Sequence, residues 1–241
     1  MRTKNILIFG TNSSILRSYI KKSLDNEINI IGISKTRDKY FENYKNFFFY
    51  KHDVLKNNNL DICKKISKKF KIDSIIFAVG GSLGLNKVFH DKKHWNTLWE
   101  YNFGYSIDVC NFFLKKFKKN NYGRILFFSS TITKNKKGPA IYSVSKKAIE
   151  DYVSKMGNNF SNNNVFINAI STSIVSEKGN NWYKFEKSKN KKSINKTLKE
   201  ILSTNKFGRA FYFDDLIDIL ITEKNHFITS SVISADGGFI K

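Results

Sequence analysis

The sequence predicts an α/β protein, built on a doubly wound sheet of seven parallel strands. Short apolar runs recur along the chain, and helix-length amphipathic segments separate them. The runs are apolar throughout, as in parallel strands covered on both faces, whereas strands with one wet face alternate polar with apolar residues. No internal repeat and no linker rich in Pro, Gly or Ser divides the 241 residues. We therefore expect a single domain over residues 1–241.

Seven apolar runs are the expected strands, and each has the length of one strand. In chain order they span residues 6–9, 28–33, 47–50, 75–79, 125–128, 165–170 and 232–233. Residues 62–70 illustrate the helices between them, because apolar residues recur there at helical spacing and Lys takes the outer face. Residues 177–209 differ, since they are polar and carry ten basic and three acidic residues. We expect this segment to leave the sheet and pass over its edge.

The basic composition does not by itself identify a partner. The chain has 42 Lys and Arg against 20 Asp and Glu, a net charge of +22, and 37 of the basic residues are Lys. These Lys are spread over the whole length instead of forming the concentrated patch of a nucleic-acid-binding protein. We interpret most of them as solvated helix faces and expect no nucleic-acid partner.

The chain also lacks the sequence features of a membrane, secreted or zinc-binding protein. No run of 18 consecutive apolar residues occurs, and the first residues lead into the first strand without a long apolar segment. The two cysteines, Cys63 and Cys110, lie far apart and have no CxxC or Cys/His spacing. We expect a reduced, cytoplasmic protein without membrane contact or a metal site.

Tyr142 and Lys146 are four residues apart, a spacing that places both side chains on one face of a helix. A nearby ammonium favours the phenolate and lowers the pKa of a phenol from about 10 toward neutral pH, which suits general acid/base catalysis. The neighbours of this pair strengthen the signal. A buried strand ends in Ser129 and Ser130, and Asn102 lies further upstream.

In this arrangement the sequence resembles the classical short-chain dehydrogenase/reductase family, and it is similar to 3-oxoacyl-carrier-protein reductase-like members. The order Asn102, Ser130, Tyr142 and Lys146 matches the active-site tetrad of that family. Further matching segments follow in the family's order along essentially the whole chain: Asp53-Val54, residues 168–171, Gly208-Arg209 and residues 236–238. The resemblance implies a Rossmann fold and a hydride transfer between a nicotinamide cofactor and a carbonyl or secondary alcohol.

The resemblance also implies a role for each member of the tetrad. Tyr142 gives a proton to the carbonyl oxygen or takes one from the alcohol, and Ser130, as the second Ser of its pair, hydrogen-bonds the same oxygen. Lys146 lowers the pKa of Tyr142 and hydrogen-bonds the nicotinamide ribose. Asn102 holds a water that links Lys146 to solvent. The structural alternatives are a helix or turn cap for Ser130, an ordinary buried amide for Asn102 and a core position for Tyr142.

The expected dinucleotide loop follows the first strand and departs from the family's GxxxGxG pattern. Only Gly10 matches, because Ser14 and Leu16 stand at the second and third glycines. A small hydroxyl at Ser14 still suits a phosphate oxygen, whereas Leu16 replaces a glycine that allows close helix–strand packing. Two further family motifs are reduced to Ala78-Val79-Gly80 and Thr172-Ser173.

NADP is the favoured cofactor, with NAD as the alternative. The second strand lacks the acidic residue that binds the 2′-hydroxyl of NAD, and Lys35 and Arg37 near its end suit a 2′-phosphate. The expected dinucleotide-binding residues, several of them by resemblance alone, are Gly10, Asn12, Ser13, Ser14, Ile15, Lys35, Arg37, Asp53, Val54, Ala78, Gly80, Tyr142, Lys146 and Val175.

By resemblance, residues 177–209 cover the substrate. Two substrate classes stay open: a 3-oxoacyl group on an acidic carrier protein, or a sugar-like precursor of a surface polysaccharide, for which residues 179–182 offer hydrogen bonds and a stacking ring. The rival interpretation is a structural or regulatory pseudo-enzyme whose altered glycine loop no longer binds nucleotide. The resemblance further implies a homodimer or homotetramer, with apolar helix surface from Phe103, Tyr105, Ile107, Phe112 and Phe113.

Overall fold

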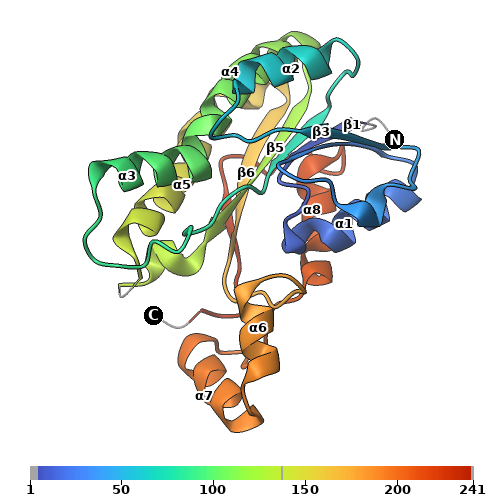
Figure 1. Ribbon diagram of the computed structural model, residues 1–241. Helices are drawn as coiled ribbons and strands as arrows, with labels where there is room; N and C mark the ends of the chain where they lie inside the picture. The colour runs from blue at the N-terminus through green and yellow to red at the C-terminus, as the bar shows by residue number, and fades with distance from the viewer. Residues whose placement is uncertain (1–4, 137, 240–241) are drawn as a thin grey trace.

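The computed structural model describes residues 5–136 and 138–239, and a sheet of seven parallel strands forms its centre (Figure 1). The strands are β1 (Asn5–Phe9), β2 (Asn29–Ser34), β3 (Phe47–Lys51), β4 (Ser74–Phe77), β5 (Gly123–Ser130), β6 (Val165–Thr172) and β7 (Val232–Ala235). Their order is β3-β2-β1-β4-β5-β6-β7, so the chain winds to one edge and then, from β4 onward, to the other. The doubly wound sheet is confirmed, and each predicted run overlaps one of these strands, although 28–33 begins one residue before β2 and 75–79 extends two residues past β4.

Successive side chains of the strands enter two separate apolar cores. In β1, Leu7 and Phe9 belong to the core on one face of the sheet. Their neighbours Ile6 and Ile8 belong to the core on the other face, and all four side chains are fully buried. Because both faces are covered, apolar side chains fill most positions of these strands, which is why the runs are apolar throughout.

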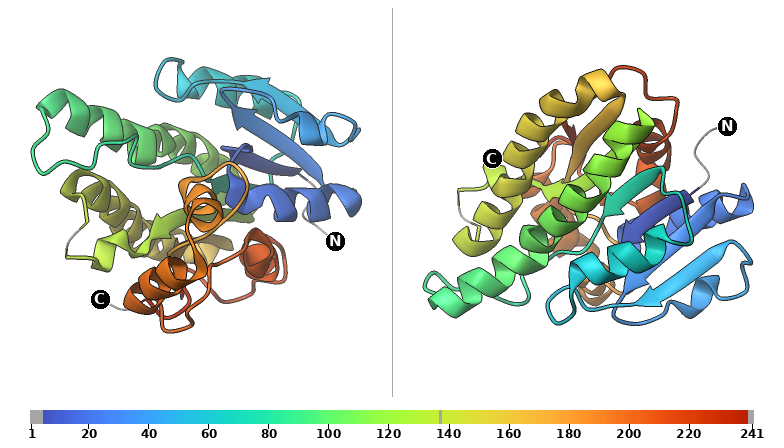
Figure 2. Two further views of the ribbon diagram at one scale, coloured as in Figure 1. Left: turned by 60° about the horizontal axis from the view of Figure 1, so that its bottom comes forward. Right: turned by 90° about the horizontal axis from the view of Figure 1, so that it is seen from above.

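Helices form a layer on each face of the sheet. One layer consists of α2 (Asn59–Ser67), α4 (Tyr105–Asn120) and α5 (Ala140–Phe160), which lie side by side in cyan to yellow in the right-hand view of Figure 2. The other layer consists of α1 (Arg17–Asp25) and α8 (Asp214–Ile221). The helix α3 (Lys92–Trp99) runs into α4 through a π-helical turn, Glu100–Gly104. Such turns widen a helix locally and occur often at functional sites.

Two helices, α6 (Asn181–Ser188) and α7 (Lys191–Ile201), lie outside both layers, beyond the carboxyl ends of the strands (Figure 1). They cover a small core of their own, in which Leu198 and Leu202 pack with Ile174 and Phe207. Trp182 is partly buried against this core, with its ring 6.5 Å from that of Phe207. The segment thus leaves the sheet, as the sequence predicts.

Both cysteines lie within one helix layer. Cys63 on α2 and Cys110 on α4 are free and fully buried, and burial raises the pKa of each thiol to about 12.

In the part of the chain that the structure describes, no helix combines the length and apolar character needed to span a membrane. The same residues contain no group of three His, Cys, Asp or Glu side chains arranged to hold a metal ion.

The expected oligomer surface on the π-helical turn and α4 is wrong for three of its five residues. Phe103, Tyr105 and Phe113 are at most 5% exposed and belong to the core beneath the helix. Tyr105 shows why, because its ring lies 5.7 Å from that of Phe9 and 5.8 Å from that of Phe77, at the carboxyl ends of two central strands. The other two residues of the set are partly buried. These aromatic side chains serve mainly to cover the sheet.

Candidate active site

The tetrad residues gather at the carboxyl ends of the central strands. Ser130 is the last residue of β5, and Tyr142 and Lys146 lie near the beginning of α5. Asn102 lies on the π-helical turn between α3 and α4. In a doubly wound sheet, ligands bind at the carboxyl edge, beside the point where the strand order reverses. Here that point is the β1–β4 pair.

Lys146 is a buried cation. The residue is only 5% exposed, and its Nζ donates a hydrogen bond of 2.7 Å to the backbone oxygen of Phe128 on β5. Burial lowers the pKa of Lys146 from 10.5 to about 8. The ammonium therefore persists at neutral pH but is poorly solvated, which leaves it available to a ligand hydroxyl group.

Tyr142 lies on the same helix face, with Lys146 Nζ 5.9 Å from the centre of its ring. Burial raises the pKa of Tyr142 to about 12, and a hydrogen bond with Ser130 opposes that rise. The prediction that Lys146 lowers this pKa is therefore wrong for the structure. The Lys146 ammonium lies near the ring of Tyr142 and donates its hydrogen bond to the backbone oxygen of Phe128. At neutral pH the phenol carries its proton, which suits a donor to a carbonyl oxygen.

Asn102 is a buried amide whose hydrogen bonds fix the loop after β4. Its Nδ2 donates to the backbone oxygens of Leu98 at 3.0 Å and Gly81 at 3.1 Å, and its Oδ1 accepts from Gly81 N at 2.9 Å. A Cβ built on Gly80 would lie 2.8 Å from Asn102 Oδ1 and 3.0 Å from Lys146 Nζ. Glycine is therefore required at position 80 to let these two polar groups approach the loop. The water-holding role of Asn102 stays a prediction.

The two serines at the end of β5 have different environments. Ser130 Oγ accepts a hydrogen bond of 3.2 Å from Ile132 N. Ser129 Oγ instead donates to the buried carboxylate of Glu150 at 2.8 Å, which supports the choice of Ser130 as the catalytic hydroxyl. Glu150 also accepts from Thr133 Oγ1 at 3.0 Å, so it holds the chain on both sides of Ser130. Sequence reasoning missed Glu150, although it follows Lys146 by four residues on the same helix.

A cavity of about 800 Å³ opens above the tetrad. Ser130 and Tyr142 lie in its wall, where they can meet a substrate oxygen. Another part of its wall comes from the 177–209 segment and includes Trp182, the expected stacking ring. The remaining lining residues are Thr131, Ile132, Asn135, Lys136, Ser173, Ile174, Glu200, Ile201 and Phe239.

A second cavity, of about 370 Å³, lies along the carboxyl ends of β1, β2 and β4. Seven of the expected dinucleotide-binding residues line it: Gly10, Asn12, Ser13, Lys35, Val54, Ala78 and Gly80. The lining also includes six residues that were not expected: Ile33, Ser34, Thr36, His52, Val79 and Tyr101. Five of the six end an apolar run or follow one within three residues, which is their nearest sequence signal, whereas Tyr101 lies on the π-helical turn and follows no such run.

Gly10 and Leu16 show how the altered loop is accommodated. Gly10 has φ +93°, and a Cβ there would lie 2.8 Å from the backbone of Ala78. The retained glycine is thus required by the approach of β4. Leu16 is fully buried in the core under α1, so its side chain points away from the loop instead of obstructing it. Ile15 is partly buried against the same core.

The basic residues after β2 occupy two different settings. Lys35 lines the cavity of about 370 Å³ and forms an ion pair of 3.3 Å with Asp53, and its Nζ lies 5.6 Å from the ring of Tyr101. Arg37 is exposed and is not among the lining residues. Val175 is buried beside a third cavity, of about 530 Å³, which shares Ser173 and Ile174 with the cavity of about 800 Å³.

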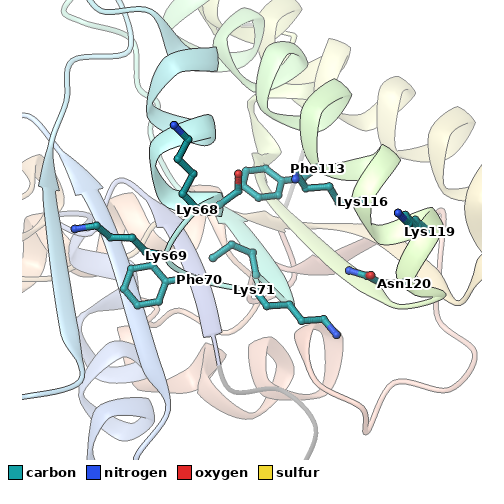
Figure 3. A pocket seen from close by; sticks show the side chains of 10 residues that line it. Lys68, Lys69, Phe70, Lys71, Phe113, Lys116, Lys119 and Asn120 are labelled. Carbon is teal, nitrogen blue, oxygen red and sulfur yellow. The ribbon is translucent and has the colours of Figure 1, made fainter.

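A further hollow of about 470 Å³ lies at the opposite, amino-terminal edge of the sheet (Figure 3). It is formed between the end of α2 and the end of α4, and five lysines line it around Phe70 and Phe113. None of the expected site residues belongs to it. It is therefore separate from the candidate active site.

Comparisons with known proteins bear on the family. The sequence model of the short chain dehydrogenase family matches residues 4–188, which is more than half of the chain. The solved structure of ElxO with NADP bound is 24% identical, with 98% of each chain covered and a TM-score of 0.85. A 3-oxoacyl (acyl-carrier-protein) reductase from Agrobacterium tumefaciens C58, with NADP bound, is 14% identical over 98% of this chain and 94% of its own, with a TM-score of 0.86. Among curated proteins, no match was found.

A short chain dehydrogenase from Leptospira borgpetersenii, with bound NAD+, is similar in the same way. It is 16% identical, covers 99% of this chain and 93% of its own, and has a TM-score of 0.84. At such low identity these likenesses establish the fold, a Rossmann-type α/β sheet. The sequence match over residues 4–188 goes further and agrees with the gathered tetrad. The chain belongs to the short-chain dehydrogenase family of oxidoreductases.

Proposed function

We propose that the protein transfers a hydride between NADP(H) and a carbonyl or secondary-alcohol substrate. In this proposal the chain acts as one catalytic domain and residues 177–209 cover the substrate. The observation that carries the proposal is the position of the tetrad between two cavities. Ser130 and Tyr142 line the larger cavity. Gly80 lines the smaller one, and its Cα lies close to the side chains of Asn102 and Lys146.

The donor set of the smaller cavity fits a dinucleotide phosphate. Polar donors at Asn12, Ser13 and Thr36 stand near the cation of Lys35, and Val54 offers an apolar contact for an adenine ring. NADP is bound in the similar structures of ElxO and the Agrobacterium reductase, and NAD+ in that of the Leptospira protein. When bound, the nicotinamide supplies or accepts the hydride.

The residues of this chain would manage the proton and the substrate oxygen. Tyr142, protonated at neutral pH, donates its proton to the carbonyl oxygen, and Ser130 hydrogen-bonds that oxygen as charge develops on it. Lys146, with its pKa lowered to about 8, binds the nicotinamide ribose and resupplies the proton to Tyr142. Asn102 keeps the loop at Gly81 in place beside it.

Of the two substrate classes, the cavity favours the 3-oxoacyl thioester. Its wall includes Ile132, Ile174 and Ile201, and these apolar side chains suit an acyl chain better than a sugar. Trp182 packs against Phe185 with ring centres 5.8 Å apart, so its ring serves the local core as well as the cavity. Rates of NADPH oxidation with a 3-oxoacyl thioester and with a keto-sugar nucleotide would separate the two classes.

We also propose a homo-oligomer in a reducing, cytoplasmic setting. The exposed side chains of Trp95, Trp99 and Val144 on α3 and α5 supply apolar surface for self-association. The two free thiols support the reducing compartment. Sedimentation of the purified protein would measure the number of subunits.

Binding of NADPH to the purified protein tests the proposal against the pseudo-enzyme alternative. We expect enhanced NADPH fluorescence and a raised melting temperature. We expect Tyr142→Phe to keep this binding and to lose turnover of a carbonyl substrate by at least a hundredfold, because the proton donor is gone. No binding by the unsubstituted protein would favour the pseudo-enzyme, and unchanged turnover by Tyr142→Phe would refute the assigned mechanism.

A further inference from the structure

One side chain of the 177–209 segment reaches the loop after β1. Asn180 caps α6, with its Oδ1 accepting a hydrogen bond of 2.9 Å from Tyr183 N. Its Nδ2 donates to the backbone oxygen of Val175 at 2.9 Å and to Ser14 Oγ at 3.3 Å. The two hydrogens of the amide group are thus both used, one to fix Asn180 on its own segment and the other to reach Ser14.

The direction of the bond between Asn180 and Ser14 decides what the serine can do. A hydroxyl has one proton and accepts at its lone pairs. Because Ser14 Oγ accepts from Asn180 Nδ2, its own proton is available to another acceptor. Ser14 directly follows Ser13, which lines the proposed dinucleotide cavity, and it begins the helical turn Ser14–Leu16. An anionic oxygen in this part of the cavity would be the natural acceptor.

We propose that Asn180 is a positioning residue for the dinucleotide: it holds the Ser14 hydroxyl as a donor to a pyrophosphate oxygen. This inference rests on the proposed function, since it needs a dinucleotide in the loop. It also explains how the loop accommodates a serine where the related family pattern has glycine. A neutral hydroxyl with a fixed donor direction adds a hydrogen bond to the phosphate, whereas a freely rotating one loses entropy when it binds.

The inference links cofactor binding to the segment over the substrate. Asn180 lies at the beginning of α6, and α6 and α7 carry part of the wall of the substrate cavity. A dinucleotide held through Ser14 therefore favours the arrangement in which this wall is in place. By the same linkage, loss of the Asn180 amide weakens dinucleotide binding.

The chain offers a matched control for the capping role of Asn180. Asn190 caps α7 in the same way, with its Oδ1 accepting from Ser193 N at 2.9 Å. Among the described residues, Asn190 has no hydrogen bond to the loop of residues 10–16. Serine is a good cap that is neutral and carries no amide. Asn180→Ser and Asn190→Ser thus keep the two caps, and only the first removes a donor to Ser14.

A double-mutant cycle tests the proposal by fluorescence titration of NADPH without substrate. We expect Asn180→Ser to weaken NADPH binding about tenfold, the contribution of one hydrogen bond to a charged group, and Asn190→Ser to change it less than twofold. In a Ser14→Ala background, Asn180→Ser should have less than a twofold effect, because the group through which it acts is absent. In turnover assays, the KM for NADPH should rise while kcat stays the same.

The outcomes separate this inference from the proposed function. If the unsubstituted protein binds NADPH but Asn180→Ser binds it equally well, or if the effects of Asn180→Ser and Ser14→Ala are additive, the positioning role is refuted and the proposed function stands. If the unsubstituted protein does not bind NADPH, both are refuted. Asn180→Asp keeps the cap and reverses the bond to Ser14, so it must weaken binding at least as much and serves as the second variant if Asn180→Ser does not fold.

Discussion

Replacement of Lys146 by methionine should stabilise the protein at neutral pH while abolishing its activity. The buried ammonium has its pKa lowered from 10.5 to about 8, a difference that corresponds to about 3 kcal/mol of destabilisation at pH 7. Methionine removes this cost but also removes the 2.7 Å hydrogen bond to the Phe128 oxygen, which costs about 1–2 kcal/mol. The net expectation is a gain of about 1–2 kcal/mol in the free energy of unfolding at pH 7.

The pH dependence of the free energy of unfolding gives a sharper test, because the lowered pKa of Lys146 fixes its sign. Between the folded pKa of about 8 and the unfolded pKa of 10.5, the unfolded chain binds more protons at Lys146 than the folded protein does. The stability of the unsubstituted protein therefore rises with pH across this window, and the penalty is fully present only below about pH 8. Between pH 7 and pH 10 we expect it to gain about 2.5 kcal/mol relative to Lys146→Met. The variant is then the less stable protein at pH 10.

Urea denaturation at pH 7 and pH 10 measures this difference. Lys155→Met is the control, because Lys155 is an exposed lysine on the same helix, α5, and the general effect of pH on a Lys-rich chain is common to all three proteins. Parallel pH dependences for the unsubstituted protein and Lys146→Met would show that the ammonium is not desolvated, and the reasoning about its environment would be refuted.

Three further substitutions test other contacts. Gly80→Ala should lower kcat at least tenfold with the fold retained, since its Cβ would lie 3.0 Å from Lys146 Nζ; activity like that of the unsubstituted protein would contradict the tight approach. Glu150→Leu should lower the free energy of unfolding by about 1–3 kcal/mol and reduce kcat, because the Ser129 hydroxyl loses its acceptor and Thr133 loses one of two; Glu150→Gln keeps Oε1 and should restore most of both. Gly157→Ala should lower the free energy of unfolding by about 1–3 kcal/mol, because its Cβ would lie 2.6 Å from Ser230 N. An unchanged melting temperature would show that α5 and the chain at Ser230 move apart at little cost.

The sequence predicts the sheet well because burial on both faces leaves an unbroken apolar run at each strand. It also predicts the tetrad, since the order and spacing of Ser130, Tyr142 and Lys146 survive in a chain whose glycine loop has changed. Both signals are local in the sequence. In the structure Ser130 ends β5, Tyr142 and Lys146 lie near the beginning of α5, and Asn102 lies on the π-helical turn, while their catalytic roles stay predictions.

The sequence could not predict what depends on contacts between distant segments. The direction of the Lys146 ammonium depends on the Phe128 oxygen, a partner on another element, so spacing alone gave the wrong sign for the pKa of Tyr142. Likewise, the burial of Leu16 depends on the core beneath α1. The buried face of α4 could not be chosen either, because apolar residues, Ile107 and Leu114 among them, extend around much of that helix.

The two buried thiols in α2 and α4 allow local opening of this helix layer to be measured by thiol alkylation. A thiol reagent in solution cannot reach Cys63 or Cys110 in the closed protein, and the raised pKa of each keeps it in the unreactive protonated form. Alkylation under native conditions therefore counts the transient openings of this layer, without any added probe. Neither thiol lines the cavities at the carboxyl edge of the sheet, so a ligand bound there does not cover it directly. A ligand that slows alkylation therefore does so by making local opening of the whole layer rarer.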